Sequence, residues 1–236
     1  PVTERIRRWP AHFLFFLANI ATGRLMARLV TVGAAAYWAQ QANFGLFNII
    51  EADDWIIWLS AFIILDFAVW LQHLLLHKIP LFWRAHSVHH SDRDLDVTTA
   101  LRFHPFELLV STTYKSAWVA LLGVPPVTAL AFEGWLNANA MFNHGNINLP
   151  RRIDWIIRPI LVTPDMHLVH HSIDADEQNH NYGFALSIWD RIFGTYIARS
   201  RHGREEQPIG MSGIRDDRAN RFLWIMKQPL LRKPPA

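Results

Sequence analysis

Hydrophobic residues gather in long runs along this chain, and polar stretches separate the runs. The clearest run covers residues 55–72, where Asp66 is the only charged residue and tryptophans stand near both ends. Its 18 residues approach the about 20 that a helix needs to cross a hydrocarbon core of about 30 Å. We therefore predict a membrane-spanning helix. Because a charge facing lipid is costly, we expect Asp66 to face protein and to form a helix–helix hydrogen bond.

Two further apolar regions flank this run. Residues 11–50 begin strongly apolar but then carry Arg24, Arg28 and four side-chain amides, so an interfacial helix and a spanning helix both remain open. Residues 117–142 are broken by Gly-Val-Pro-Pro at positions 123–126. Adjacent prolines deny helix hydrogen bonds, which predicts a helical hairpin or a strongly kinked helix.

The polar stretches predict a helical cap outside the bilayer, because strand-like alternation is weak throughout. The expected fold is all-α: a single domain over residues 1–236, built as an integral-membrane helical bundle with a helical cap. We expect membrane helices at roughly 11–50, 55–77 and 117–142, the cap at 78–107 and 143–200, and a C-terminal tail at 201–236.

Composition agrees with a few apolar helices that carry a polar cap. Hydrophobic residues make up 51% of the chain and charged residues only 18%, yet the mean hydropathy is just +0.07. The absence of cysteine excludes disulfides, thiolate metal sites and cysteine nucleophiles. The chain is mildly basic, but no recognition motif for nucleic acid is visible. Arg5, Arg7 and Arg8, beside the first apolar run, suit an anionic membrane surface better.

Histidines form four groups next to the apolar runs. One is an i, i+4 pair in "HLLLH", two are His-x-x-His-His triplets in "HSVHHS" and "HLVHHS", and one is a single histidine in "FNHGN". An i, i+3, i+4 spacing puts three imidazoles on one helical face. The grouped histidines are His73, His77, His86, His89, His90, His144, His167, His170 and His171.

Nine grouped imidazoles indicate metal binding, because neutral imidazole binds Zn, Cu, Fe and Ni and unpaired buried imidazoles are costly. The count exceeds the needs of one ion and fits two. The zinc-protease motif His-Glu-x-x-His is absent, and Glu107 and Glu133 are too few for a carboxylate-bridged di-iron site. A non-catalytic membrane metal-binding or transport protein and a zinc-dependent lipid hydrolase remain as alternatives. Transporters, however, place ligands midway along their spanning helices.

Acidic residues crowd both triplets. Carboxylates orient metal-bound imidazoles through the second ring nitrogen. Most of these residues suit a solvated loop, and we expect Asp96, Glu107 and Asp165 to be the ones that orient histidines.

The order of these motifs resembles the fatty acid hydroxylase / sterol desaturase superfamily of membrane-bound, histidine-rich di-iron oxygenases, and its bacterial sterol-desaturase-like members in particular. The resemblance runs from about Trp55 to Tyr196 and includes "HSVHHSDRDLDVTTALRFHPFE", "VTPDMHLVHHS" and "NYGFALSIWDRIFGTY". It implies that the nine histidines are iron ligands and form the catalytic centre. Several members have a further ligand four residues before the single histidine, where this chain has Ala140. His104 is the first candidate for a replacement nitrogen, although a structural His–Pro turn beside Glu107 fits it equally well. His180 is a weaker candidate, and His12 and His202 are expected to be non-functional.

The resemblance also implies the reaction. It is O2-dependent hydroxylation, with desaturation as a variant, of a C–H bond in a sterol, fatty acyl or related lipid. The implied cofactors are two iron ions, which zinc can replace in a structure, with O2 as co-substrate. Electrons come from a separate donor, ferredoxin or cytochrome b5-like. The expected location is a multi-pass position in a bacterial inner membrane, rather than in the endoplasmic reticulum. We expect the cap, with its histidine-rich dimetal site, to face the cytoplasm, because the basic residues on that side are Arg5, Arg7, Arg8, Lys78, Arg84 and those of the Arg-rich C-terminal part.

Overall fold

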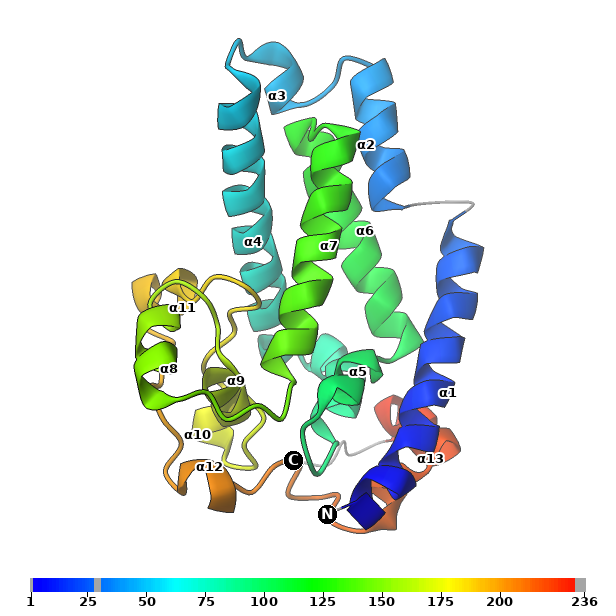
Figure 1. Ribbon diagram of the computed structural model, residues 1–236. Coiled ribbons are helices and arrows are strands. Elements are labelled where there is room, and N and C mark those ends of the chain that lie inside the picture. The colour runs from blue at the N-terminus through cyan, green and yellow to red at the C-terminus, as the bar shows by residue number, and fades with distance from the viewer. Residues whose placement is uncertain (1, 28–30, 232–236) are drawn as a thin grey trace.

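The computed structural model describes residues 2–27 and 31–231, and its regular elements in this part of the chain are helices (Figure 1). Backbone pairing between extended segments is limited there to isolated bridges, such as the one between Leu161 and Leu186. The predicted all-α class is therefore confirmed for the described residues.

Long helices form an elongated bundle with the cap at one end (Figure 1). The first two helices follow each other toward the far end, the next long helix returns, and the last two form a hairpin. A short helix at the far end, α3 (Leu46–Ile49), precedes the returning helix. The bundle consists of α1 (Val2–Met26), α2 (Val32–Gln41), α4 (Asp54–Lys78), α6 (Pro105–Leu122) and α7 (Pro126–Asn143).

Helix α4 contains the run that predicted a membrane span. Among the described residues it is the one helix that is long and apolar enough to cross a bilayer. Asp66 faces protein, as expected, but its partners lie in the cap. The Trp189 indole and the Leu186 amide donate to Asp66 Oδ2 at 2.8 and 3.3 Å. The expected helix–helix hydrogen bond is therefore present, and the partner helix is α11 (Ile188–Ile192) of the cap. Asp66 thereby fixes the cap segment around Leu186 to α4.

The hairpin alternative is correct for the third apolar region. Helix α6 ends at Gly123, whose φ of 67° is left-handed, and Pro125 and Pro126 start α7. The loop before α3 packs tightly on this turn: a Cβ atom on Gly45 would lie 2.3 Å from the Gly123 nitrogen. Because Pro105 pre-sets the first turn of α6, that helix begins well before residue 117, the predicted boundary.

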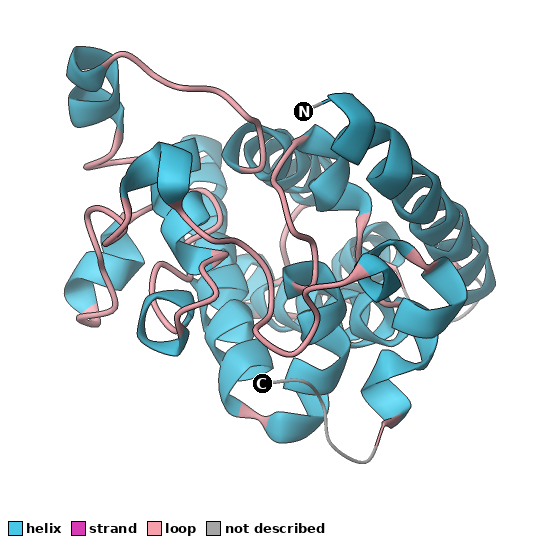
Figure 2. Cartoon of the chain, turned by 90° about the horizontal axis from the view of Figure 1, so that it is seen from below, coloured by secondary structure: helices cyan, strands magenta, loops and turns pink. Residues whose placement is uncertain are grey.

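Short helices and long connections build the cap (Figure 2). The segment predicted as a C-terminal tail belongs to it as far as residue 231, since Ile225 is fully buried and packs in one cluster with Phe15 and Val88. The cap elements are α5 (Pro80–His90), η1 (Val97–Leu101), α8 (Arg151–Ile157), α9 (Pro164–His170), α10 (Ala175–Gln178), α11 (Ile188–Ile192), α12 (Gly203–Glu206), η2 (Asp217–Asn220), α13 (Phe222–Lys227) and η3 (Gln228–Leu230).

Arg8 joins α1 to the cap from inside the protein. Its side chain is 1% exposed, and it donates to both carboxylate oxygens of Asp92, at 2.7 and 2.8 Å. Burial opposes ionisation of Asp92, but His12 and Arg8 hold its pKa well below the usual range. The prediction that Arg8 faces an anionic membrane surface was therefore wrong. Its charge is matched by the acidic residues that follow the first histidine triplet.

Candidate metal centre

The structure brings all nine grouped histidines together where the bundle meets the cap. His73 and His77 stand in the last two turns of α4, and His144 caps α7. The first triplet lies at the end of α5 and the second at the end of α9. Eight of the nine are at most 4% exposed. Four segments between residues 73 and 171 thus deliver their imidazoles to one buried volume.

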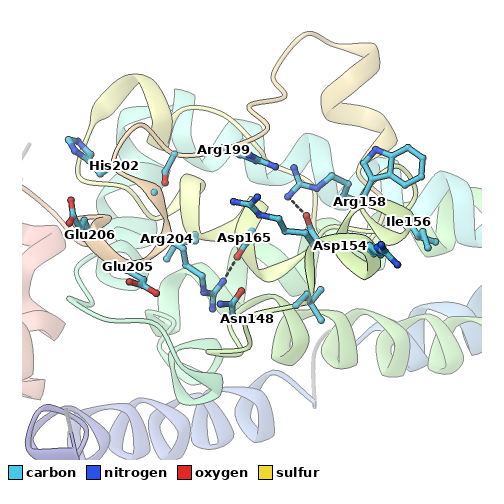
Figure 3. A pocket seen from close by; sticks show the side chains of 17 residues that line it. Asn148, Asp154, Ile156, Arg158, Asp165, Arg199, His202, Arg204, Glu205 and Glu206 are labelled. Carbon is cyan, nitrogen blue, oxygen red and sulfur yellow. Dashed lines mark hydrogen bonds and ion pairs between the residues drawn. The ribbon is translucent and has the colours of Figure 1, made fainter.

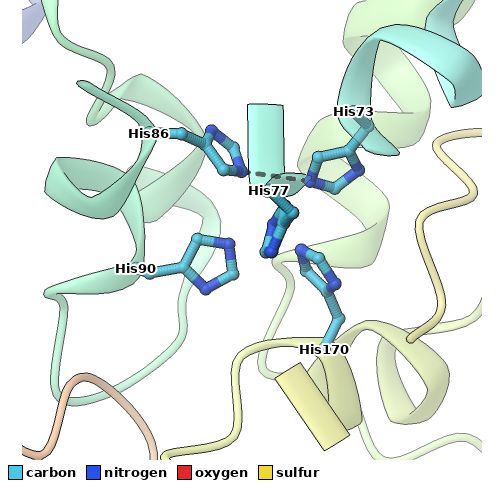
Figure 4. Close-up of side chains that lie close together, drawn as sticks. All are labelled: His73, His77, His86, His90 and His170. Carbon is cyan, nitrogen blue, oxygen red and sulfur yellow. Dashed lines mark hydrogen bonds between the residues drawn. The ribbon is translucent and has the colours of Figure 1, made fainter. Parts of the chain in front are cut away.

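The ring nitrogens form two separate groups. Within each group, the candidate ligand atoms lie within 4.8 Å of one another. The five-histidine cluster consists of His73, His77, His86, His90 and His170 (Figure 4), and the four-histidine cluster of His89, His144, His167 and His171.

Each triplet serves both clusters, in opposite ways. Residues four apart on a helix lie about 40° apart around its axis, so His86 and His90 point into the same cluster while His89 points into the other. In the second triplet His167 and His171 share the four-histidine cluster, and His170 enters the five-histidine cluster. The rings of His90 and His171, one from each cluster, are stacked at 4.5 Å. The two groups are therefore adjacent halves of one centre.

Hydrogen bonds fix the protonation of three rings in the five-histidine cluster. The Nδ1 atoms of His73 and His170 donate to the carbonyls of Tyr182 and His180, each at 2.8 Å. His86 Nδ1 donates to Glu107 Oε1 at 2.7 Å. A neutral ring whose Nδ1 carries the proton has only a lone pair at Nε2.

Those lone pairs are placed as ligands around a cation would be. His73 Nε2 and His86 Nε2 face each other at 3.1 Å (Figure 4), and two lone pairs at this distance repel. Two nitrogens that each lie about 2.1 Å from one ion are about 3.0–3.4 Å apart for angles between square and tetrahedral. The buried Nε2 atoms of His77, His90 and His170 have no hydrogen-bond partner either. The donor set therefore fits a metal ion.

The four-histidine cluster shows the same arrangement around His144. His144 Nδ1 donates to the Ala140 carbonyl at 2.7 Å, which leaves Nε2 bare. This atom lies 3.0 Å from the Nε2 atoms of both His89 and His167. His171 Nε2 lies 3.2 Å from His167 Nε2. These spacings fit nitrogens around a second ion.

Burial keeps these imidazoles neutral. It lowers the pKa of His144 to about 4 and that of His170 to about 3. The pKa values of His89, His90, His167 and His171 also fall well below the usual value, for the same reason. Since neutral imidazole is the form that binds metal, the protein holds these histidines ready as ligands.

Of the residues expected to orient histidines, Glu107 touches one and the other two do not. Asp96 binds Arg8, Trp9 and Thr98, and its side chain caps η1. Asp165 pairs with Arg204 at the surface of the cap. The structure thus assigns Asp96 and Asp165 to packing between segments.

His104 lies outside both clusters. Its Nδ1 accepts the Phe106 amide as the N-cap of α6, and its Nε2 lies 3.3 Å from the Met226 carbonyl. The structure thus places His104 in a His–Pro turn at the start of α6, and its ring belongs to neither group of ring nitrogens. The rings of His180, His12 and His202 also lie outside the clusters, against Asp176, Asp92 and Asp174.

Sequence reasoning missed the backbone groups that orient the rings. The carbonyls of Ala140, His180 and Tyr182 each accept an imidazole proton, and carbonyls leave no signal in side-chain identity. A side chain holds one of them in place: Asp190 accepts the amides of Tyr182 and Gly183 at 2.9 and 2.7 Å. Asp190, in "SIWDRIF", is the one side chain of this arrangement that the sequence could have pointed to.

A cavity of about 260 Å³ opens beside the five-histidine cluster, and His73, His86 and Ala140 are in its wall. Most of the remaining wall is apolar, but α6 contributes Glu107, Ser111 and Lys115 at successive four-residue steps. The Lys115 ammonium binds both oxygens of Glu133 on α7, at 2.7 and 2.8 Å. The apolar lining consists of Phe16, Val69, Leu76, Ala100, Leu101, Phe103, Leu108, Leu136 and Phe184.

Several characterised lipid-oxidising enzymes are similar in sequence to this chain. Human alkylglycerol monooxygenase is 33% identical over 164 residues, which cover 67% of this chain and 34% of the relative. The ornithine lipid hydroxylase OlsE of Rhizobium tropici is 32% identical over 176 residues, 72% of this chain and 49% of the relative. Human cholesterol 25-hydroxylase is 29% identical over 136 residues, 56% of this chain and 47% of the relative.

The chain thus spans about a third to a half of the length of these relatives. No solved structure is similar enough to count as a match. The family model described as fatty acid hydroxylase matches residues 58–195, which include every histidine of both clusters. On this match, together with the relatives above, the chain belongs to the fatty acid hydroxylase family.

Proposed function

We propose that this protein is a multi-pass membrane enzyme that hydroxylates a C–H bond of a lipid with O2, at two iron ions held by the nine histidines. The observation that carries the proposal is the contact between the apolar cavity and the five-histidine cluster. His73 and His86 are at once cluster members and cavity wall. A lipid chain in this cavity would reach the metal centre without leaving an apolar environment.

The two clusters differ in the number of nitrogens that they offer to a metal ion. Iron accepts imidazole ligands, and iron bound here would supply the redox chemistry that activates O2. One cluster offers five nitrogens to such an ion and the other offers four. Ala140, which stands where several superfamily members carry a further ligand, lines the cavity and accounts for the lower count around His144.

The protein itself orients the ligands and excludes water from the site. The Nδ1 acceptors Tyr182, His180 and Ala140 orient the rings, so that their Nε2 atoms point inward. The apolar walls exclude water and hold the reacting carbon near the centre. The polar stripe of α6 extends about 12 Å along its helix from Glu107 to Lys115. That stripe favours a lipid with hydroxyl, ether or amide groups over a plain hydrocarbon chain.

The relatives suggest which lipids to try first. Their names specify alkylglycerol, ornithine lipid and cholesterol. Of these, an alkylglycerol and an ornithine lipid carry polar groups beside a long chain, which matches the mixed walls of the cavity. Hydroxylation next to an ether oxygen would cleave an alkylglycerol through a hemiacetal, whereas a second hydrogen abstraction elsewhere would give desaturation.

The bundle suggests the topology. We propose that α1 with α2, α4, α6 and α7 cross the inner membrane of a bacterium, since the N-terminus and the cap lie at the same end of the bundle (Figure 1). The exposed Lys78 and the partly buried Arg84 lie at that end. The positive-inside rule places it in the cytoplasm, where a ferredoxin or cytochrome b5-like donor would deliver electrons.

Metal analysis of anaerobically purified protein tests the proposal. We expect two iron ions per chain. We also expect O2 uptake that requires both a reductant and a lipid such as 1-O-hexadecylglycerol. Zinc alone with full activity in the absence of O2 would support a lipid hydrolase instead, and bound metal without O2 uptake with any lipid class would support a metal-binding protein. Lipid profiling of cells with and without the protein would then identify the substrate.

A further inference from the structure

Exposed apolar side chains cover one side of the cap, on α8, on α11 and just beyond them. Trp155 is 75% exposed, Ile156 65% and Ile192 60%, values expected of charged rather than of large apolar residues. We call this surface the shoulder, and it consists of Trp155, Ile156, Ile160, Ile188, Ile192 and Phe193.

The shoulder is fixed to the side of α4. Asp66 accepts the Trp189 indole, and Trp70 donates to Asp190 at 3.0 Å, so two neighbouring residues of α11 are tied to α4. The ring of Phe193 stacks on that of Trp70 with centroids 4.6 Å apart. The segment just after α8 is joined to the residues before α11, because the Ser187 amide donates to the Ile160 carbonyl at 3.0 Å.

These contacts set the depth of the shoulder, provided that α4 crosses the membrane, as the proposed function holds. Asp66 and Trp70 lie about 18 and 24 Å along α4 from Asp54. A hydrocarbon core of about 30 Å that starts near Asp54 therefore extends past both residues. The side chains of α11 would lie just inside the boundary between acyl chains and headgroups, where exposed tryptophan and isoleucine are stable.

A basic hollow lies next to the shoulder. It has a volume of about 1030 Å³, and its lining includes Trp155 and Ile156 of the shoulder (Figure 3). Arg158 pairs with Asp154, and Arg204 with Asp165. Glu205 and Glu206 stand at the end opposite Arg158 and Ile156 (Figure 3). Three more guanidinium groups of the lining form no hydrogen bond or ion pair with any described residue, and they belong to Arg151, Arg152 and Arg199.

We propose that the shoulder inserts into the cytoplasmic headgroup region and that the hollow binds an anionic phospholipid. The phosphate would meet the three unpaired arginines, and the acyl chains would lie along Trp155 and Ile156. Arginine forks match phosphate oxygens bidentately, and the apolar wall on the lipid side selects a lipid rather than a soluble phosphate. The cap would thereby hold the metal centre at a fixed height over the leaflet that supplies the substrate.

Depth-sensitive labelling tests the insertion, and the chain has no cysteine of its own to interfere. Ile156→Cys, Leu59→Cys on the exposed side of α4 and Asp217→Cys on η2 would each carry an NBD fluorophore in phospholipid nanodiscs. We expect blue-shifted emission and quenching by doxyl-labelled lipid at positions 156 and 59, with neither at 217. Aqueous emission at 156 with lipid emission at 59 would overturn the shoulder alone. Aqueous emission at both would overturn the membrane topology of the proposed function as well.

Short-chain lipids test the hollow, with the Ile156→Cys probe in detergent as the readout. We expect dihexanoyl phosphatidylglycerol to shift the emission at a concentration at least fivefold lower than dihexanoyl phosphatidylcholine, and inorganic phosphate to leave it unchanged. Replacing Arg151, Arg152 and Arg199 with Gln should remove the difference. The charge-matched control that replaces Arg215, Arg218 and Arg221 with Gln should keep it. Equal responses to the two lipids, an equal response to phosphate, or loss in the control would each overturn the proposed lipid site.

Discussion

His86 and Glu107 form the one contact between a carboxylate and the nine histidines in the described part of the chain. The His86 Nδ1 lies 2.7 Å from Glu107 Oε1, and both residues line the cavity beside the five-histidine cluster. The Glu107 side chain is 5% exposed, and its second oxygen has no hydrogen-bond partner. This pair therefore joins a carboxylate in the wall of the cavity to an imidazole of the five-histidine cluster.

Replacing Glu107 with Gln should weaken metal binding at the five-histidine cluster. The amide keeps the shape and can accept the same proton, but it removes the negative charge that makes His86 a stronger donor. Loss of such a partner typically lowers metal affinity or activity about 10–100-fold. Competition for the metal with chelators of increasing affinity measures the change in metal affinity. Asp165→Asn is the matched control, since Asp165 pairs with Arg204 and should leave the affinity unchanged. Equal effects of the two variants would contradict the role of Glu107.

His90 and His104 should respond in opposite ways to substitution. His90→Ala removes a nitrogen that has no partner inside the protein, so we expect at least one iron ion per chain to be lost. His104→Asn keeps a good N-cap for α6 and should retain both ions, whereas His104→Ala should cost about 0.5–2 kcal/mol of stability. Iron content and thermal unfolding in detergent separate these outcomes. Iron loss in His104→Asn would reinstate His104 as a ligand.

The gathering of the nine histidines at one site could be predicted, because their spacing is visible in the sequence. Metal binding was the role that best accounted for two triplets and an i, i+4 pair. The count indicated two groups, but which histidines belong to each group could not be predicted. It depends on how α5 and α9 are rotated about their axes, and a tertiary fold sets that rotation. The helical hairpin was readable from Pro125 and Pro126, since proline acts on the backbone locally.

Partners that lie far apart in the sequence could not be identified from it. Arg8 and Asp92 are 84 residues apart, and nothing local distinguishes an arginine that meets lipid from one that meets buried carboxylates. Asp66 forms the expected helix–helix hydrogen bond, but nothing local could identify Trp189 of the cap, 123 residues away, as its partner. In both cases the residue type was informative about pairing, and only the fold could supply the partner.

Ala140→His should add a ligand to the four-histidine cluster. Position 140 lies one helical turn before His144 on α7, so a histidine there would share a face with His144. We expect metal retention under chelator challenge to rise while hydroxylation falls, because the added ring occupies a coordination position and part of the cavity. Ala140→Leu adds similar bulk without a nitrogen. Equal retention in the two variants would show that position 140 does not reach the metal.

Filling the cavity should block catalysis and spare the metals. Leu136 lines the cavity and is 8% exposed, so Leu136→Trp places a large ring in the space assigned to lipid. We expect lipid-dependent O2 uptake to fall at least tenfold with two iron ions still bound. Leu130→Trp on the same helix is the control, because Leu130 is 63% exposed and should accept the ring without loss. Full activity in Leu136→Trp would exclude this cavity as the substrate site.

Arg8→Gln should loosen the attachment of α1 to the cap. The substitution leaves Asp92, whose side chain is 1% exposed, with His12 and Thr99 as its remaining side-chain partners. Removing one partner of a buried ion pair typically costs about 3–5 kcal/mol, because the other charge stays buried. We therefore expect a clearly lower thermal midpoint in detergent, followed by easier iron loss, since Asp92 stands two residues after His90. Arg5→Gln, on the same helix, should change neither. If Arg8→Gln melted like the parent, the Arg8–Asp92 pair would contribute little to stability, and other contacts of α1 would have to hold it against the metal centre.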